Sequence, residues 1–170
     1  MEVLTAPRSA PAPSIANSDS FPINGTDHLE FYVGNAKQSA MYYQAALGFE
    51  VVAYAGPETG VRDRVSYVLQ QDKIRIVLTS SLYPGSEIAQ HVAEHGDGVK
   101  VLALWVDDAE QAFYTALSRG AEAVFAPKKL QNEDGEVVLA AIKTYGETIH
   151  TLVERRNYQG IFMPGYEPRT

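Results

Sequence analysis

The 170-residue chain contains no cysteine and no long uninterrupted apolar run. The lack of cysteine excludes disulfides, thiolate metal sites, Fe–S clusters and a cysteine nucleophile. No apolar run approaches the ~18 residues that a membrane helix needs. The N-terminus also lacks the basic-then-apolar order of a signal peptide. We therefore expect a cytoplasmic protein that does not associate with membranes.

Positive charge is scarce as well, with 14 Lys and Arg against 21 Asp and Glu and a formal net charge of −7. This balance disfavours a phosphate-binding surface, so we expect no nucleic acid partner. The rest of the composition, 45% hydrophobic and 21% charged, is that of a globular protein. The length corresponds to about one domain. Residues 1–20 are rich in Ala, Pro and Ser, which predicts a disordered tail before an ordered domain over 21–156.

The first half of this domain has the pattern of one strand, one helix and three strands. Apolar and polar residues alternate over 28–33, as in a strand with one apolar face. Asn35 followed by Gln38 has the spacing of a capping box, and Gly48 is placed to end the helix that follows. Three more strands are expected, at 49–55, 65–70 and 73–79.

The second half repeats this order after a short connecting helix at 86–95. A strand at 101–106 precedes a cap at Asp107-Asp108 and a helix that Gly120 ends. Strands at 122–125, 137–143 and 148–154 follow. A shift of 73 residues superposes the halves, which gives two βαβββ modules at about 26–80 and 98–155. The prediction is an α+β fold in which paired curved sheets form a cup with the helices outside.

Strand alternation assigns the two faces of these sheets. The face beneath the helices is expected to hold Leu29, Phe31, Val33, Ile74, Ile76, Leu78, Leu102, Leu104 and Val106. The cup is expected to be lined by Glu30, Tyr32, Arg75 and Trp105 together with His28, Val77, Thr79, Val101 and Ala103. Two arrangements of Glu30 and Arg75 are possible. They form an ion pair in the cup, or one of them reaches solvent at the rim, and the sequence leaves both possibilities open.

Four histidines are the candidate metal ligands, because mononuclear sites commonly combine imidazoles with a carboxylate. His28 and His150 lie on strands and are placed to face the cup. His91 and His95 have an i, i+4 spacing that can chelate a metal, but no Glu follows His91 in the HExxH manner. We interpret their helix as solvated. We interpret Asp107-Asp108 as a helix cap, and no nucleophile, phosphate-loop or dinucleotide motif is present.

Longer motifs are more specific. Residues 28–38 (HLEFYVGNAKQ), followed by Ala40 and Tyr42-Tyr43, resemble the start of the 4-hydroxyphenylpyruvate dioxygenase family. The resemblance continues through 58–60, 66–69, 74–79, 150–155 and 162–166, and it covers about residues 21–168.

This resemblance implies a vicinal-oxygen-chelate (glyoxalase-like) fold and an Fe(II)-dependent enzyme of tyrosine catabolism. The family converts 4-hydroxyphenylpyruvate and O2 to homogentisate and CO2. Its iron ligands, two His and one Glu, lie in a C-terminal catalytic domain beyond this chain. The resemblance therefore implies a non-catalytic N-terminal domain, inactive alone, that packs on the catalytic domain and contributes to a homo-oligomer. We expect no catalytic or cofactor-binding residue here.

The resemblance also bears on the metal question and on the last residues. Comparison with glyoxalase-like relatives places His28 and His150 at two of four metal positions, with Val77 and Val101 at the others. Since valine offers no lone pair, we expect a relic cup without a metal. Residues 157–170 are expected to be a linker toward the catalytic domain, and 158–166 to be an exposed apolar strip that favours self-association.

Three alternatives remain at this point. The first is the N-terminal domain of hydroxymandelate synthase, which resembles the dioxygenase throughout; the residues that decide between the two lie outside this chain, and we favour the dioxygenase. A stand-alone module is a second alternative, with a small acidic or aromatic ligand near Tyr32, Arg75 and Trp105. A glyoxalase-type metalloenzyme is the third, and Val77 and Val101 disfavour it.

Overall fold

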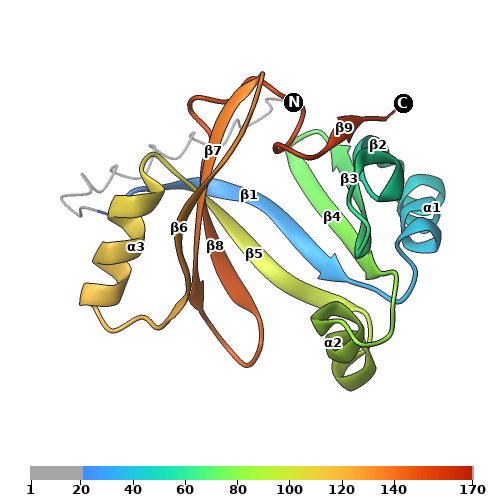
Figure 1. Cartoon of the computed structure of the whole chain (residues 1–170), viewed down its shortest axis with the longest axis horizontal. Coiled ribbons are helices and arrows are strands. Elements are labelled where there is room, and N and C mark those ends of the chain that lie inside the picture. Colours follow the sequence, from blue (N-terminus) through green and yellow to red (C-terminus); the bar gives the residue numbers. More distant parts are fainter. Residues whose placement is uncertain (1–20, 170) are drawn as a thin grey trace, which may run out of the picture.

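The computed structural model describes residues 21–169, so the expected tail at 1–20 lies outside the described residues. Between residues 21 and 169, no helix is long and apolar enough to cross a membrane. The structure is one curled sheet with helices on its outer side (Figure 1). This arrangement confirms the predicted α+β fold.

The elements follow the predicted order (Figure 1). The first module consists of β1 (Ile23–Tyr32), α1 (Ala36–Leu47), β2 (Glu50–Ala55), β3 (Arg64–Gln71) and β4 (Ile74–Ser81), with a 3-10 turn at Pro57–Thr59. Helix α2 (Glu87–His95) connects it to the second module. That module consists of β5 (Gly98–Val106), α3 (Ala109–Ser118), β6 (Ala123–Asn132), β7 (Gly135–Lys143) and β8 (Ile149–Glu154), and β9 (Glu167–Pro168) follows.

The two modules join through their first strands. The sheet order is β6-β7-β8-β5-β1-β4-β3-β2-β9, with β1 and β5 antiparallel at the centre. Each of these strands pairs in parallel with the last strand of its own module, β1 with β4 and β5 with β8. The sheet is therefore symmetric about its centre, as expected for a duplicated unit. Among the strands of residues 21–169, only β9, which pairs with β2, has no counterpart.

The helix caps repeat between the modules. The Asn35 side chain accepts a 3.0 Å bond from the amide of Gln38, and that of Asp108 accepts a 2.8 Å bond from the amide of Gln111. Each cap satisfies an amide that lacks a partner in the first helical turn. The cap prediction for Asp108 is therefore confirmed, although α3 ends at Ser118 and its C-cap is Arg119, one residue before Gly120.

Helices α1 and α3 each cover an apolar cluster on the outer face of the sheet. Val33, Ile76 and Leu78 are buried under α1, and Val106 is buried against Phe113 of α3. Leu29, Phe31 and Leu104 pack against these clusters. The expected helix-facing set is thus largely confirmed. Two residues are exceptions: Ile74 is 56% exposed at the start of β4, and Leu102 belongs to neither cluster.

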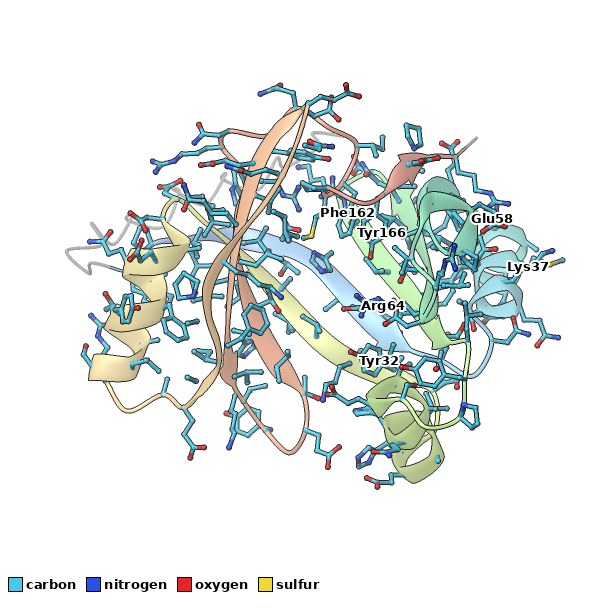
Figure 2. All side chains as sticks on the ribbon, in the orientation of Figure 1. Tyr32, Lys37, Glu58, Arg64, Phe162 and Tyr166 are labelled. Carbon is cyan, nitrogen blue, oxygen red and sulfur yellow. The ribbon has the colours of Figure 1, made fainter. Side chains whose placement is uncertain are left out.

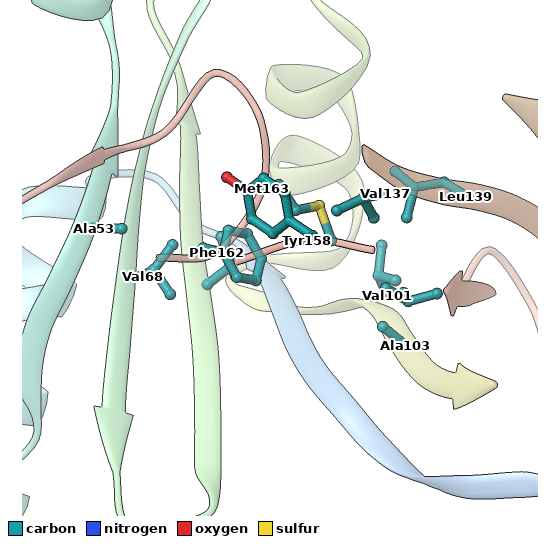
Figure 3. Close-up of a cluster of buried hydrophobic side chains, with 11 residues drawn as sticks. Ala53, Val68, Val101, Ala103, Val137, Leu139, Tyr158, Phe162 and Met163 are labelled. Atoms are coloured by element: carbon teal, nitrogen blue, oxygen red, sulfur yellow. The ribbon is translucent and has the colours of Figure 1, made fainter. Parts of the chain in front are cut away.

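A third cluster fills part of the concave side, and it contains the residues expected to be a linker. Tyr158, Phe162 and Met163 are buried between the two halves of the sheet, as Figure 3 shows. They pack with Ala53 and Val68 from one half and with the buried residues Val101, Ala103, Val137, Leu139 and Val153 from the other. The prediction of an exposed apolar strip at 158–166 is therefore wrong, because these side chains complete the core of their own domain. Of the three large apolar residues 161–163, Ile161 alone is exposed.

Candidate functional site

A cavity of about 400 Å³ opens on the concave side of the sheet. Figure 2 shows Tyr32, Arg64, Phe162 and Tyr166 along this side. Polar side chains from several elements line it: His28, Glu30, Tyr32, Arg64, Lys128, Thr151 and Tyr166. Its apolar wall includes Val77, Val101, Phe125, Leu139, Ile149, Phe162 and Met163. An apolar cavity with a few polar groups is typical of a small-molecule site.

A series of linked hydrogen bonds runs along the first-module side of the cavity. Glu30 accepts a 2.7 Å hydrogen bond from the hydroxyl of Thr79, which lies 2.8 Å from the Ser66 hydroxyl. Ser66 in turn bonds the side chain of Tyr166. Burial raises the pKa of the Tyr166 hydroxyl well above its usual range, and the nearby carboxylate of Glu30 adds to the effect. Tyr166 therefore stays a neutral phenol at physiological pH.

A second polar group adjoins the cavity at His28, which is part of the cavity lining. Arg155 donates from Nε to Asp27 Oδ2 at 2.6 Å and from Nη2 to Asp27 Oδ1 at 2.7 Å. The Nδ1 atom of His28 lies 2.7 Å from the same Oδ1. Burial alone would raise the pKa of Asp27, but the hydrogen bonds from His28 and Arg155, together with the charge of Arg155, hold it well below its usual range. Asp27 is thus a buried, permanently ionised partner for two side chains.

The same group positions Phe162. Arg155 Nη1 donates a 2.6 Å hydrogen bond to the Phe162 carbonyl. The ring of Phe162 meets His28 edge-on at 5.1 Å, and the guanidinium groups of Arg75 and Arg155 each lie 5.7 Å from its centre. Phe162 is therefore held at its carbonyl by Arg155, its ring is contacted by three side chains, and it forms part of the cavity wall.

The structure divides the larger polar and aromatic side chains that were expected to line the cup. Glu30 and Tyr32 line the cavity, whereas Arg75 and Trp105 are absent from its lining. Arg75 lies beneath Phe162, and Trp105 is 44% exposed near the end of β5. The proposed ion pair of Glu30 with Arg75 does not form, because Glu30 lies opposite Val77 in the sheet and bonds Thr79.

The two histidines considered as relic metal positions do not meet. His28 lines the cavity, but His150 does not, and its neighbours Ile149 and Thr151 do. Because strand neighbours point to opposite faces, His150 points away from the cup. Its Nδ1 lies 3.1 Å from the carbonyl oxygen of Leu102. The expectation that His150 faces the cup is therefore corrected.

The cup residues do not fit a metal centre. One ring nitrogen of His28 is engaged by Asp27, the Glu30 carboxylate accepts from Thr79, and Val77 and Val101 occupy the cavity wall. Within residues 21–169, the group of side chains that could hold a metal lies elsewhere, at His91, His95 and Glu147. The interpretation of the 86–95 helix as solvated is also corrected, because His91 is buried.

Sequence reasoning missed Asp27 and Arg155, which lie beside this site, and it placed Phe162 in a linker. Asp27 lies where the register of β1 against β5 shifts between Thr26 and His28. Such a bulge re-aims a side chain and breaks the alternation on which the assignment of faces rested. A carboxylate directly before a strand histidine was the one available signal.

Comparisons with known proteins agree with this geometry. Residues 18–166 match the family described as "Hydroxyphenylpyruvate dioxygenase, HPPD, N-terminal". The chain is 43% identical to 4-hydroxyphenylpyruvate dioxygenase of Aspergillus fumigatus over 176 residues, which cover 95% of this chain and 44% of that protein. The chain thus spans less than half the length of this relative.

Two solved structures share the fold. A mutant of 4-hydroxymandelate synthase from Streptomyces coelicolor matches with a TM-score of 0.78 and 30% identity, over 87% of this chain and 42% of that one. Methylmalonyl-CoA epimerase from Mycobacterium tuberculosis matches with a TM-score of 0.63 and 21% identity, over 80% of this chain and 91% of that one. The latter likeness shows the vicinal-oxygen-chelate fold alone. On the family match and the duplicated βαβββ architecture together, the chain belongs to the hydroxyphenylpyruvate dioxygenase N-terminal domain family.

Proposed function

We propose that this chain is the non-catalytic N-terminal domain of a 4-hydroxyphenylpyruvate dioxygenase, where it supports folding and subunit assembly. The observation that carries the proposal is a sequence match to a dioxygenase. The match covers 95% of this chain but 44% of the dioxygenase. In this proposal, conversion of 4-hydroxyphenylpyruvate and O2 to homogentisate and CO2 takes place on a C-terminal domain. That domain is the partner of this one in the same polypeptide.

The cup supports the non-catalytic part of the proposal. Fe(II) of the dioxygenase type needs two imidazoles and a carboxylate around open positions. The cavity lining contains one imidazole, that of His28, and one carboxylate, that of Glu30, so the second imidazole is missing. We therefore assign the iron to ligands outside this chain and derive no chemical step through the cup.

The first experiment tests the isolated chain. The purified 170-residue protein is given Fe(II), ascorbate, O2 and 4-hydroxyphenylpyruvate, and both bound iron and homogentisate are measured. We expect no stoichiometric iron in the cup and no turnover. Homogentisate formation by the chain alone would contradict the assignment of catalysis to another domain.

The second experiment tests the assembly role. The matching N-terminal part of the Aspergillus fumigatus dioxygenase is replaced with this chain, and the chimera is assayed for homogentisate. We expect an active, folded chimera, whereas the catalytic part expressed without any N-terminal domain should be insoluble or inactive. A well-folded chimera that lacks activity, or an equally active catalytic part alone, would count against the proposal.

The N-terminal domain of a 4-hydroxymandelate synthase is the second candidate, favoured by the TM-score of 0.78 to such an enzyme. The two candidates differ in the product of the whole protein, homogentisate or 4-hydroxymandelate. Product chromatography on the whole protein that carries this chain therefore separates them. We favour the dioxygenase, because identity is 43% to a dioxygenase and 30% to the synthase.

A further inference from the structure

Two histidines and a glutamate from distant parts of the chain meet outside the cup. His91 and His95 lie one turn apart on α2, and Glu147 lies in the loop between β7 and β8. One ligand atom from each of the three side chains lies within 4.8 Å of the other two. In Figure 1 this loop lies at the same end of the molecule as α2. The sequence separates Glu147 from His95 by 52 positions, so the fold alone creates the group.

Each member has a geometry suited to coordination. The His95 Nε2 atom lies 2.9 Å from Glu147 Oε2, and the two imidazole rings are centred 4.7 Å apart. Ligand atoms bound about 2.1 Å from a tetrahedral Zn²⁺ are about 3.4 Å apart. Side-chain rotations that move the ligand atoms by about an ångström would therefore bring all three to this separation. His95 and Glu147 are exposed, so their side chains have room for these rotations.

A second, independent observation concerns His91. This residue is 7% exposed, and its Nδ1 atom is buried without a hydrogen-bond partner. A buried polar atom without a partner costs free energy, and such atoms are rare in native structures. The ring also packs edge-on against Tyr32 at 5.4 Å, which fixes its orientation. An unsatisfied imidazole beside a second imidazole and a carboxylate is the arrangement expected of a ligand without its ion.

We propose that His91, His95 and Glu147 bind a divalent transition metal of the zinc class. Two imidazoles and one carboxylate suit Zn²⁺, Co²⁺ and Ni²⁺ better than Mg²⁺ or Ca²⁺, which prefer oxygen ligands alone. Bound there, the ion joins the helix that connects the modules to a loop of the second module. Its role is to hold this helix and this loop together. It is separate from the iron of the proposed function and does not depend on it.

The surrounding charges allow a cation at this place. Lys100 carries a positive charge close to this group, and its Nζ donates to the backbone carbonyl of Glu147 at 2.9 Å. The carboxylates of Glu87, 3.8 Å from Lys100, and of Glu94, 3.9 Å from His95, offset it. Burial lowers the pKa of His91, and the charge of Lys100 lowers it further. A neutral imidazole has the lone pair that metal binding requires.

The test is a Zn²⁺ titration of the untagged full chain in competition with a chromophoric chelator. We expect one site with a Kd below about 100 μM. Co²⁺ at the same site should show the visible absorption bands of a low-coordinate centre, and the ion should raise Tm in a concentration-dependent way. His95→Ala and Glu147→Gln should each weaken Zn²⁺ binding more than fivefold. Both residues are exposed, so these variants should fold.

Glu94→Gln is the matched control, because it removes a nearby charge on the same helix without removing a ligand. It should weaken binding less than fivefold. Two results would overturn the proposal: a wild-type Kd above about 100 μM, or affinity within fivefold of wild type in either ligand variant. Neither result bears on homogentisate formation, so failure here leaves the proposed function untouched.

Discussion

Arg155, directly after the last strand of the second module, holds the carboxylate of Asp27 in the first strand with two hydrogen bonds of 2.6 and 2.7 Å. The Asp27 side chain is 3% exposed and that of Arg155 is 19% exposed. The third contact of this arginine, to the Phe162 carbonyl, ties the C-terminal segment to the same point. One guanidinium therefore connects both modules with the segment that fills the cup.

Removal of one partner of this pair should be strongly destabilising. Asp27→Ala leaves the buried cation of Arg155 uncompensated, so we expect a loss of about 3–5 kcal/mol in the free energy of unfolding. Urea unfolding measures it, and a double-mutant cycle with Arg155→Ala should show coupling above about 0.5 kcal/mol. The exposed pair of Lys143 and Glu122 is the control, since its loss should cost less than about 1 kcal/mol. Equal costs for the two pairs would contradict this account.

The pH dependence of stability follows from the low pKa of Asp27. Its ordinary pKa is 3.8, and the folded state holds it well below that value. Between these two values the unfolded chain binds more protons than the folded chain, so stability falls as the pH falls. The full contribution of the group is present above about pH 5 and declines through pH 4 and below. Asp27→Asn, which cannot titrate, should lose less stability than wild type between about pH 5 and pH 3; parallel losses would show that other groups cause the acid sensitivity.

Phe162 provides a test of whether the C-terminal segment belongs to the core. Phe162→Ala removes a side chain that is 2% exposed, and we expect a cost of about 3–5 kcal/mol. Its neighbour Ile161 is 43% exposed, so Ile161→Ala should change stability by about 0.5 kcal/mol or less. Thermal or urea unfolding of both variants gives the comparison. If the segment were only a linker, the two substitutions would have the same small effect.

Gly135 makes a backbone contact that also depends on the C-terminal segment. Its φ is +120°, and a Cβ atom at this position would overlap the carbonyl oxygen of Asn157. That oxygen accepts a 3.0 Å bond from the amide of Glu136. Gly135→Ala should therefore destabilise by more than Gly146→Ala, whose φ is +56° in open space and which should cost about 1–2 kcal/mol. Hydrogen exchange at the Glu136 amide should quicken in the first variant only.

Much of the fold was predictable because its signals are local. Capping residues such as Asn35 and Asp108 act within one helical turn, and strand alternation requires only neighbours. The repeat of these signals at a fixed offset predicted the duplication without any distant contact. Glu30 and Tyr32 were correctly placed in the cup by the same alternation, since the register of β1 against β4 is regular from Leu29 to Tyr32.

The wrong predictions share one cause: each concerns a feature that depends on residues far apart in the sequence. The bulge at Asp27 and the outward face of His150 depend on how strands pair, which alternation along one strand does not specify. Segment 157–166 has neither a helical nor a strand period, so its apolar residues looked like a linker. Their burial depends on a cup formed by residues far away in the sequence.

The sequence by itself determined the helices, the strands, the two modules and the family, because propensity, capping and motif identity are carried by residues close together in the chain. Only the tertiary structure decided which side chains meet: Arg155 with Asp27, Phe162 with both halves of the sheet, and His91 and His95 with Glu147. Those contacts depend on strand register, on a bulge and on the closure of the cup. They are properties of the packed chain, since His95 and Glu147, 52 positions apart, and Asp27 and Arg155, 128 positions apart, meet only once the sheet has curled.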